Sequence, residues 1–327
     1  MIEPTLKYVT CPGAAAQGGS SHEMAYWEWN QTGNPAHPHV IMCVHGLTRQ
    51  GRDFDVLARS LSQHARVICP DVAGRGKSDW LADPMQYGMA QYAQDMLALL
   101  AQLHAQAPVL RLDWVGTSMG GLIGMVIAGS PELPLPVPVR RLLLNDVGPV
   151  LAWPALQRIA SYVGKTGSFD SLQQGADALR TISAGFGPHT DADWLALSRP
   201  MLRQRGDGRW TLHYDPAIAV PFQQLTQQAS EQGQALWWCL YDRIKAQTLL
   251  ARGAQSDLLT SETARDMQQR GPLAQCVELE GVGHAPTFVA NDQVVIARNF
   301  LLGDEWKKSK NNGCVSCRRL RLEWAED

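Results

Sequence analysis

A serine stands at the centre of a glycine-rich segment, residues 116–121, with the sequence Gly-Thr-Ser-Met-Gly-Gly. The segment matches the pattern G-x-S-x-G, which occurs where a buried strand turns sharply into a helix. Only small residues fit two positions before and two after such a serine, and Gly116 and Gly120 supply them. The turn would present the Ser118 hydroxyl at the end of a sheet, beside the positive end of a helix. These features favour Ser118 as a nucleophile, with a helix-capping serine as the alternative.

A serine hydroxyl is a weak nucleophile and needs a neighbouring base. Of the nine histidines, His284 follows the last expected strand in a short loop flanked by glycine, and we expect it to be that base. A carboxylate then has to hold the imidazole in one tautomer. Asp257, which follows an expected strand at 248–252, is the first candidate, with a turn aspartate as its alternative role. Asp146, at the end of the preceding strand, is the second candidate.

This chemistry also needs two donors for the oxyanion of a tetrahedral intermediate. The backbone N–H of Met119, directly after the serine, is the expected first donor. The second is expected from Leu47, because a tight turn at Gly46 after a strand would direct the Leu47 N–H into the site. An ordinary loop position is the alternative for Leu47. For His45 we expect a structural hydrogen bond, since no run of further ligands accompanies it.

The elements that would hold these residues alternate between strand and helix patterns. Strands are expected at residues 6–11, 25–30, 40–45, 66–71, 110–116, 141–145, 248–252 and 276–280, and helices at 54–63, 89–106 and 120–129. The alternation predicts an α/β fold with a mostly parallel sheet. Residues 147–247 break it with helical patterning and five of the 11 tryptophans. We therefore predict one core, residues 1–146 and 248–302, interrupted by a helical cap, residues 147–247.

Composition excludes several classes of protein. The 29 basic and 31 acidic residues give a net charge of -2, which argues against nucleic-acid binding, and 45% hydrophobic residues argue against a wholly disordered chain. No apolar stretch is long enough to predict a membrane span, and the first residues lack the pattern of a secretory signal. Seven scattered cysteines fit a reducing compartment, so we expect a cytoplasmic protein.

The last segment, residues 303–327, is dense in charge and lacks apolar periodicity, so we expect it to be peripheral or disordered. It contains Cys314 and Cys317 as a lone C-x-x-C motif. Zinc usually takes four ligands, and neither a second cysteine pair nor a nearby histidine is present. Inert thiols are therefore favoured over metal or redox chemistry.

Taken in chain order, these motifs resemble those of the α/β-hydrolase superfamily. The matching segments are Val-His-Gly-Leu at 44–47, Asp-Val-Ala-Gly-Arg-Gly-Lys-Ser at 71–78, Gly-Thr-Ser-Met-Gly-Gly at 116–121, Gly-Ala-Gln-Ser-Asp at 253–257 and Gly-His at 283–284. The resemblance spans about residues 25 to 302 and implies an eight-stranded, mostly parallel sheet with a helical cap inserted after the sixth strand. The serine at position 118 resembles that of esterases, lipases, carbon–carbon-bond hydrolases and cofactor-free haloperoxidases. Haloalkane dehalogenases and epoxide hydrolases carry aspartate there.

We therefore expect a serine esterase, monomeric or homodimeric, that cleaves small to medium, fairly apolar carboxylic esters through an acyl-enzyme. No metal or organic cofactor is expected, and the tryptophans of the cap fit an apolar substrate pocket. Three alternatives stay open. They are a carbon–carbon-bond hydrolase of ring-fission diketones with the same residues, acyl transfer to an acceptor other than water, and a non-catalytic binding protein of hydrolase fold.

Overall fold

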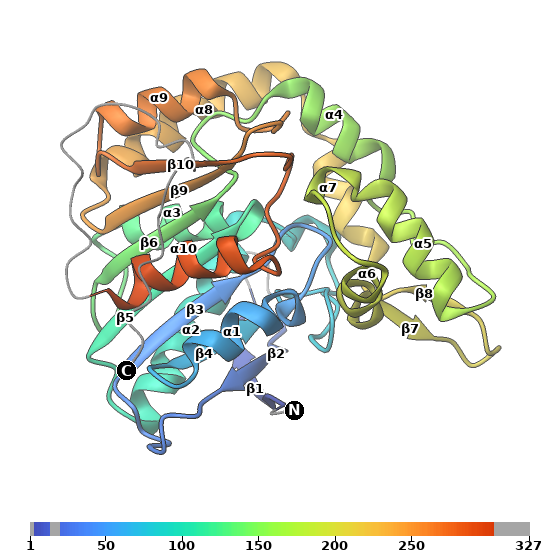
Figure 1. Cartoon of the computed structure of the whole chain (residues 1–327), viewed down its shortest axis with the longest axis horizontal. Coiled ribbons are helices and arrows are strands. Elements are labelled where there is room, and N and C mark those ends of the chain that lie inside the picture. Colours follow the sequence, from blue (N-terminus) through green and yellow to red (C-terminus); the bar gives the residue numbers. More distant parts are fainter. Residues whose placement is uncertain (1–2, 14–19, 304–327) are drawn as a thin grey trace, which may run out of the picture.

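The computed structural model describes residues 3–13 and 20–303 of the chain. Its main sheet is built from β1 (Thr5–Cys11), β2 (His22–Trp29), β3 (His39–Val44), β4 (Arg66–Pro70), β5 (Arg111–Thr117), β6 (Val139–Asn145), β9 (Gln247–Gly253) and β10 (Gln275–Leu279). The spatial order is β1-β2-β4-β3-β5-β6-β9-β10 (Figure 1). β2 runs antiparallel to β1 and β4, and every other pair of neighbours is parallel. The expected α/β fold with a mostly parallel eight-stranded sheet is confirmed.

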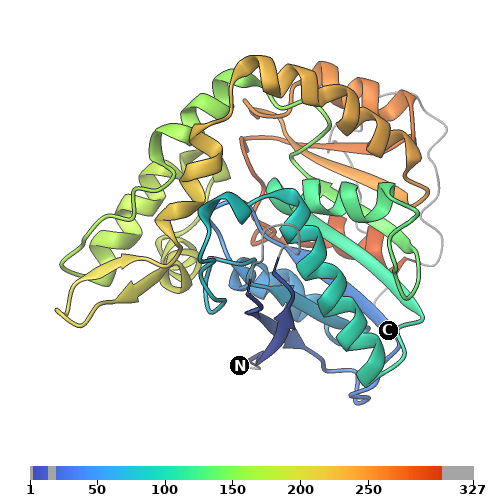
Figure 2. The same ribbon diagram turned by 180° about the vertical axis from the view of Figure 1, so that it is seen from behind.

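Helices cover both faces of this sheet. The core helices are α1 (Asp55–Leu61), α2 (Met89–Gln106), α3 (Met119–Gly129), α9 (Ser261–Gln269) and α10 (Asn291–Leu302). Figure 1 shows α1 and α10 on the near face, and Figure 2 shows α2 and α3 on the opposite face. Along β3, Ile41 and Cys43 join the apolar cluster under α1 and α10, whereas Met42 and Val44 join the cluster under α2 and α3. Burial on both faces explains why the central strands are continuously apolar in sequence.

The chain between β6 and β9, referred to below as the insertion, forms a separate group of elements. These are α4 (Trp153–Tyr162), α5 (Leu172–Ile182), α6 (Asp191–Ser198), β7 (Leu202–Gln204), β8 (Trp210–Leu212), α7 (Ala219–Gln223) and α8 (Gln227–Arg243). Figure 1 shows α4 to α7 and the β7–β8 hairpin extending to the right of the sheet. α8 runs back to the core, where the Leu240 carbonyl oxygen would lie 2.3 Å from a Cβ on Gly129 of α3. The helical patterning is therefore observed, with an unexpected two-stranded hairpin in its middle.

The sequence also gives expectations for the tail, for membrane spans and for the cysteines. We expect a peripheral or disordered tail with inert thiols at Cys314 and Cys317. Residues 304–327, on which this expectation falls, lie outside the described residues. None of the helices in the described part of the chain combines the length and the apolar character needed to cross a lipid bilayer. The five cysteines within residues 3–13 and 20–303 are all free thiols.

Two glycines let β3, β5 and α3 approach one another closely beside Ser118. A Cβ on Gly116 would lie 2.3 Å from the carbonyl oxygen of Gly120, and a Cβ on Gly120 would lie 2.0 Å from that of Val44. Both distances are far shorter than van der Waals contact, and the atoms met are backbone atoms that cannot rotate away. The glycines of the G-x-S-x-G pattern are therefore required by the packing of the first turn of α3 against the sheet.

Replacing Gly120 with alanine should push α3 away from β3. We expect Gly120→Ala to lower the free energy of unfolding by about 3 kcal/mol, at the upper end of the usual range for overpacking, as measured by urea denaturation. Gly233→Ala in α8 is the matched control, since nothing lies within 4 Å of a Cβ there. The control should gain about 0.5–1 kcal/mol from helix propensity. An unchanged unfolding midpoint in Gly120→Ala would contradict this account of the packing.

His45 joins the loop after β3 to the loop after β4. The residue is fully buried. Its Nδ1–H donates to the Gly46 carbonyl oxygen at 2.7 Å, and its Nε2 accepts the N–H of Val72 at 2.9 Å. Both bonds together require the neutral ring with its proton on Nδ1. Burial, reinforced by the charges of Arg75 and Arg49, lowers the pKa of His45 to about 3. The expected structural role of His45 is thus visible in its contacts.

The lowered pKa of His45 makes folding sensitive to acid. Between about pH 3 and its ordinary pKa of 6.5, the unfolded chain binds one more proton at this ring than the folded chain does. The free energy of unfolding should therefore fall as pH decreases from 6.5 toward 3, by up to about 1.4 kcal/mol per pH unit from this residue. In His45→Gln that contribution should vanish. Urea unfolding between pH 6.5 and 4 tests this, and identical slopes in both proteins would contradict it.

Candidate active site

Ser118 occupies the sharp turn between β5 and α3. Its backbone has φ 51° and ψ -116°, a left-handed conformation that few residues other than glycine adopt. Its N–H donates to the carbonyl of Asn145 at 3.0 Å, and its own carbonyl accepts from Gly121 and Leu122 in the first turn of α3. These bonds fix the strained turn on both sides. The serine side chain is thereby held at the N-terminal end of α3, as the sequence predicts.

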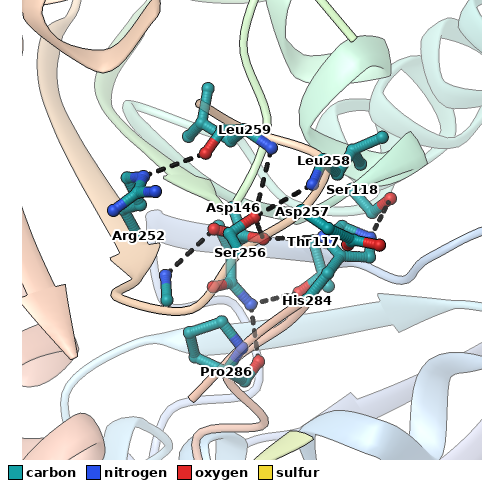
Figure 3. A network of polar contacts seen from close by, with 12 residues as sticks. Thr117, Ser118, Asp146, Arg252, Ser256, Asp257, Leu258, Leu259, His284 and Pro286 are labelled. Atoms are coloured by element: carbon teal, nitrogen blue, oxygen red, sulfur yellow. Dashed lines mark hydrogen bonds and ion pairs between the residues drawn. The ribbon is translucent and has the colours of Figure 1, made fainter. Parts of the chain in front are cut away.

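The His284 imidazole lies against the Ser118 hydroxyl (Figure 3). The distance from Nε2 to Oγ is 3.0 Å, although the two residues are 166 positions apart in sequence. His284 belongs to the loop between β10 and α10, and its side chain is only 12% exposed. When the proton of the neutral ring is on Nδ1, Nε2 is free to accept the serine proton. The structure therefore brings together the nucleophile and the base expected from sequence.

The carboxylate at the other side of the ring belongs to Asp146 (Figure 3). Its Oδ2 lies 2.7 Å from Nδ1 of His284. The side chain is fully buried. Two further donors hold it in place: the N–H of Gly253 at 2.9 Å from Oδ1 and the hydroxyl of Ser256 at 2.6 Å from Oδ2. Because the Gly253 N–H and the Ser256 hydroxyl both donate to it, the carboxylate is held in one orientation. It then presents Oδ2 as an acceptor to the Nδ1–H of His284.

Asp257, the first candidate from sequence, makes different contacts. Its two carboxylate oxygens accept from Nε and Nη2 of Arg158 in α4, at 2.7 and 2.9 Å. The Arg158 and Asp257 side chains are 42% and 49% exposed. Burial alone would raise the pKa of Asp257, but the hydrogen bonds and charge of Arg158 outweigh it and hold that pKa below its ordinary value. The expected pairing of Asp257 with His284 is therefore corrected, and Asp146, the second candidate, takes that place.

Strand register explains why Asp146 reaches the imidazole. Thr117 of β5 pairs with Asn145 of β6, so the next residue of each strand, Ser118 and Asp146, emerges at the same edge of the sheet. The Asn145 amide donates to the Thr117 hydroxyl at 2.9 Å and to the carbonyl of Pro286 at 2.8 Å, which ties the loop of His284 to both strands. Asn145 is not among the residues predicted from sequence, although its position at the end of a buried strand is a signal that could have identified it.

Ser256, which orients the carboxylate of Asp146, is likewise absent from the residues predicted from sequence. Its hydroxyl also accepts the N–H groups of Leu258 and Leu259, at 3.3 and 3.1 Å. Gly253 and Ser256 donate to Asp146, whereas the next side chain, Asp257, accepts from Arg158 of the insertion. A serine next to an aspartate carries no sequence signal that separates these two roles.

The two expected oxyanion donors lie beside Ser118. A Cβ on Gly46 would be 3.7 Å from the Cβ of Ser118, so the loop that carries Leu47 passes directly by the serine. Met119 is the first residue of α3. Within the described residues, the backbone N–H groups of Leu47 and Met119 have no hydrogen-bond acceptor. Unused donors at this position can receive negative charge that develops on an oxygen next to Ser118.

The insertion rests on the loop that carries His284. The carbonyl of Gly185 accepts the N–H of Gly283 at 2.7 Å, and His189 Nε2 lies 2.8 Å from the hydroxyl of Thr287. Aromatic rings accompany these contacts, with Phe186 and Trp194 stacked at 6.2 Å between centroids. The ring of His189, which is hydrogen-bonded to Thr287, lies 5.1 Å from that of Trp194, so aromatic side chains of the insertion pack close to the loop of His284.

Comparison with known proteins agrees with this geometry. A model of the alpha/beta hydrolase family matches residues 41–298. The 3-hydroxybutyrate-oligomer hydrolase of Cupriavidus necator is 48% identical over 303 residues, which cover 92% of this chain and 98% of that protein. An alpha/beta hydrolase from Novosphingobium aromaticivorans has a TM-score of 0.76 at 33% identity, covering 92% of this chain and 99% of its own. A putative hydrolase from Rickettsia typhi has a TM-score of 0.79 at 27% identity, covering 91% and 98%. This chain belongs to the alpha/beta hydrolase family.

Proposed function

We propose that this protein is a serine hydrolase that cleaves carboxylic esters through an acyl-enzyme. The observation that carries the proposal is the continuous hydrogen-bonded chain from the Ser118 hydroxyl through His284 to Asp146. Membership of the alpha/beta hydrolase family and the ester-cleaving activity named for the Cupriavidus relative support it.

Acylation begins when His284 Nε2 accepts the Ser118 proton as Oγ attacks the ester carbonyl. The Asp146 carboxylate stabilises the imidazolium that forms and keeps Nδ1 protonated. The N–H groups of Leu47 and Met119 donate to the tetrahedral oxyanion. His284 then delivers its proton to the leaving alcohol, which departs and leaves the acyl group on Ser118.

Deacylation repeats the sequence with water as the nucleophile. His284 Nε2 accepts a proton from water as the water oxygen attacks the acyl carbon, and the same two N–H groups stabilise the second tetrahedral oxyanion. Collapse of this intermediate breaks the bond to Ser118 Oγ, which takes back the proton from His284. The products are a carboxylic acid and the regenerated serine.

Substitution of the two aspartates should separate the two candidates. Asp146→Asn should lower kcat about 10³- to 10⁴-fold, because an amide no longer fixes the imidazole tautomer. Asp257→Asn is the matched control and should stay within about threefold of wild type, since Asp257 is bonded to Arg158. Ser118→Ala should lose at least as much kcat as Asp146→Asn. Steady-state hydrolysis of p-nitrophenyl butyrate measures all three. A larger loss in Asp257→Asn than in Asp146→Asn would reverse the assignment, and wild-type rates in Ser118→Ala would refute the mechanism.

For the substrate, we propose short oligoesters of 3-hydroxybutyrate. The Cupriavidus relative is named for hydrolysis of such oligomers, and it aligns with almost all of this chain. Each repeat is a four-carbon, apolar unit joined by an ester, which fits the expectation of small to medium esters. Aromatic side chains of the insertion, Phe186 and Trp194, lie close to the loop of His284, and aromatic rings suit an apolar partner.

Purified enzyme should release 3-hydroxybutyrate from its linear dimer and trimer. We expect kcat/KM for the trimer to exceed that for a long-chain triacylglycerol by at least about tenfold, since each fitted apolar group adds roughly 1–3 kcal/mol of discrimination. Chromatography of the products over time gives the rates, with Ser118→Ala as the blank. Turnover of p-nitrophenyl butyrate without any cleavage of the trimer would reject this substrate class while retaining the esterase.

A further inference from the structure

We propose that Arg75 is a positioning residue for the oxyanion hole, a buried guanidinium that fixes Leu47 and Met119 from behind. The inference rests on the proposed function, because it concerns the donors used in that reaction. It also accounts for the segment 71–78, a motif of the sequence that the Ser118–His284–Asp146 chain does not use.

The burial of Arg75 is unusual for a charged side chain. Arg75 is fully buried, and within the described part of the chain no carboxylate lies at ion-pair distance from it. Arg66 offers a contrast, since it is 2% exposed and its guanidinium lies 2.7 Å from the Glu28 carboxylate. A buried charge without a counter-charge is strongly destabilising unless other groups solvate it.

Neutral groups take the place of a carboxylate around Arg75. Its Nη1 donates to the carbonyl of Ala73 at 2.6 Å and to the hydroxyl of Tyr92 at 2.9 Å. The guanidinium also lies over two rings, 5.7 Å from the centroid of Tyr87 and 5.1 Å from that of Tyr92. Carbonyl dipoles and aromatic faces both stabilise a cation. They hold the charge in place while leaving it un-neutralised.

The remaining donors of Arg75 point to the candidate site. Nε donates to the carbonyl of Leu47 at 2.9 Å, and Nη2 lies 3.8 Å from the sulfur of Met119. Leu47 and Met119 are the two residues whose backbone N–H groups are the proposed oxyanion donors. One planar side chain therefore contacts both donor residues, which are 72 positions apart in sequence.

This arrangement has two effects on the reaction. Fixing the Leu47 carbonyl limits rotation of the backbone at Leu47. The Leu47 N–H, which belongs to the preceding peptide group, therefore stays where the oxyanion will form. Oxyanion stabilisation depends on donor distances of 2.7–3.1 Å, and a displacement of about 1 Å lowers the rate strongly. The un-neutralised charge also favours an anion over a neutral carbonyl in this low-dielectric setting.

The flanking glycines direct Arg75 inward. Gly74 and Gly76 have φ of 83° and 54°, in the left-handed region that favours glycine. A Cβ on Gly74 would lie 2.7 Å from the Tyr87 ring, and one on Gly76 would lie 2.2 Å from the Asp71 carboxylate. The Gly-Arg-Gly turn thus places the arginine between Tyr87 and the oxyanion loops.

Arg75→Met tests the proposal, because methionine keeps an unbranched side chain and removes the charge and the donors. We expect kcat for p-nitrophenyl butyrate to fall about 10- to 100-fold with KM within about threefold, since only the transition state carries the oxyanion. Affinity for butylboronic acid, which forms a tetrahedral adduct on Ser118, should fall by a similar factor. The pH profile of kcat/KM should keep its shape, because the His284–Asp146 pair is not touched.

Arg66→Met is the matched control for loss of a buried arginine. It should lower the free energy of unfolding while keeping wild-type kcat and boronate affinity, because Arg66 pairs with Glu28 away from the site. A folded Arg75→Met with wild-type kcat and boronate affinity would overturn the proposal.

If Arg75→Met does not fold, Arg75→Lys decides the question. Lysine keeps the charge but lacks the planar fork that reaches Leu47 and Met119 together, so kcat should fall about tenfold. Wild-type kcat in Arg75→Lys would then refute positioning. Ser118→Ala separates this inference from the proposed function. If Ser118→Ala is inactive while the Arg75 variants keep wild-type kcat, only the role of Arg75 is refuted.

Discussion

Parallel pairing of β5 with β6 is the interaction on which the candidate site depends. The register of Thr117 against Asn145 makes Ser118 and Asp146 neighbours at one edge of the sheet. The ladder continues sideways, because the N–H of Asp146 donates to the carbonyl of Ala251 in β9 at 2.8 Å. Three adjacent strand ends thus supply Ser118, Asp146 and the loop that orients the Asp146 carboxylate. A shift of one residue in this register would separate all three.

Much of this arrangement is predictable because its signals are local. Continuous apolar runs identify the central strands, and the glycines around Ser118 identify the turn, because backbone packing forbids any side chain there. The position of His284 after the last strand is equally readable. The acid is different, since Asp146 and Asp257 each follow a strand of the same edge. Their roles are decided by Arg158 and Ser256, which are distant contacts that no local pattern encodes.

Other features of the structure could not be predicted from sequence, for related reasons. The strands of the β7–β8 hairpin have three residues each, which is too short for a period of two to be visible. The return of α8 to the core depends on the close approach of Gly129 to Leu240, a contact between elements far apart in sequence. Arg75 reads as a surface residue by its type, and its burial follows only from the tyrosines and carbonyls that surround it.

The contact between the insertion and the loop of His284 ties the position of the insertion to the alignment of the imidazole. Gly185 and His189 bind residues on either side of His284, at Gly283 and Thr287. A displacement of this part of the insertion would break those bonds and remove support from the loop of His284. In the proposed reaction, the imidazole is therefore best aligned when this part of the insertion is seated on the loop of His284.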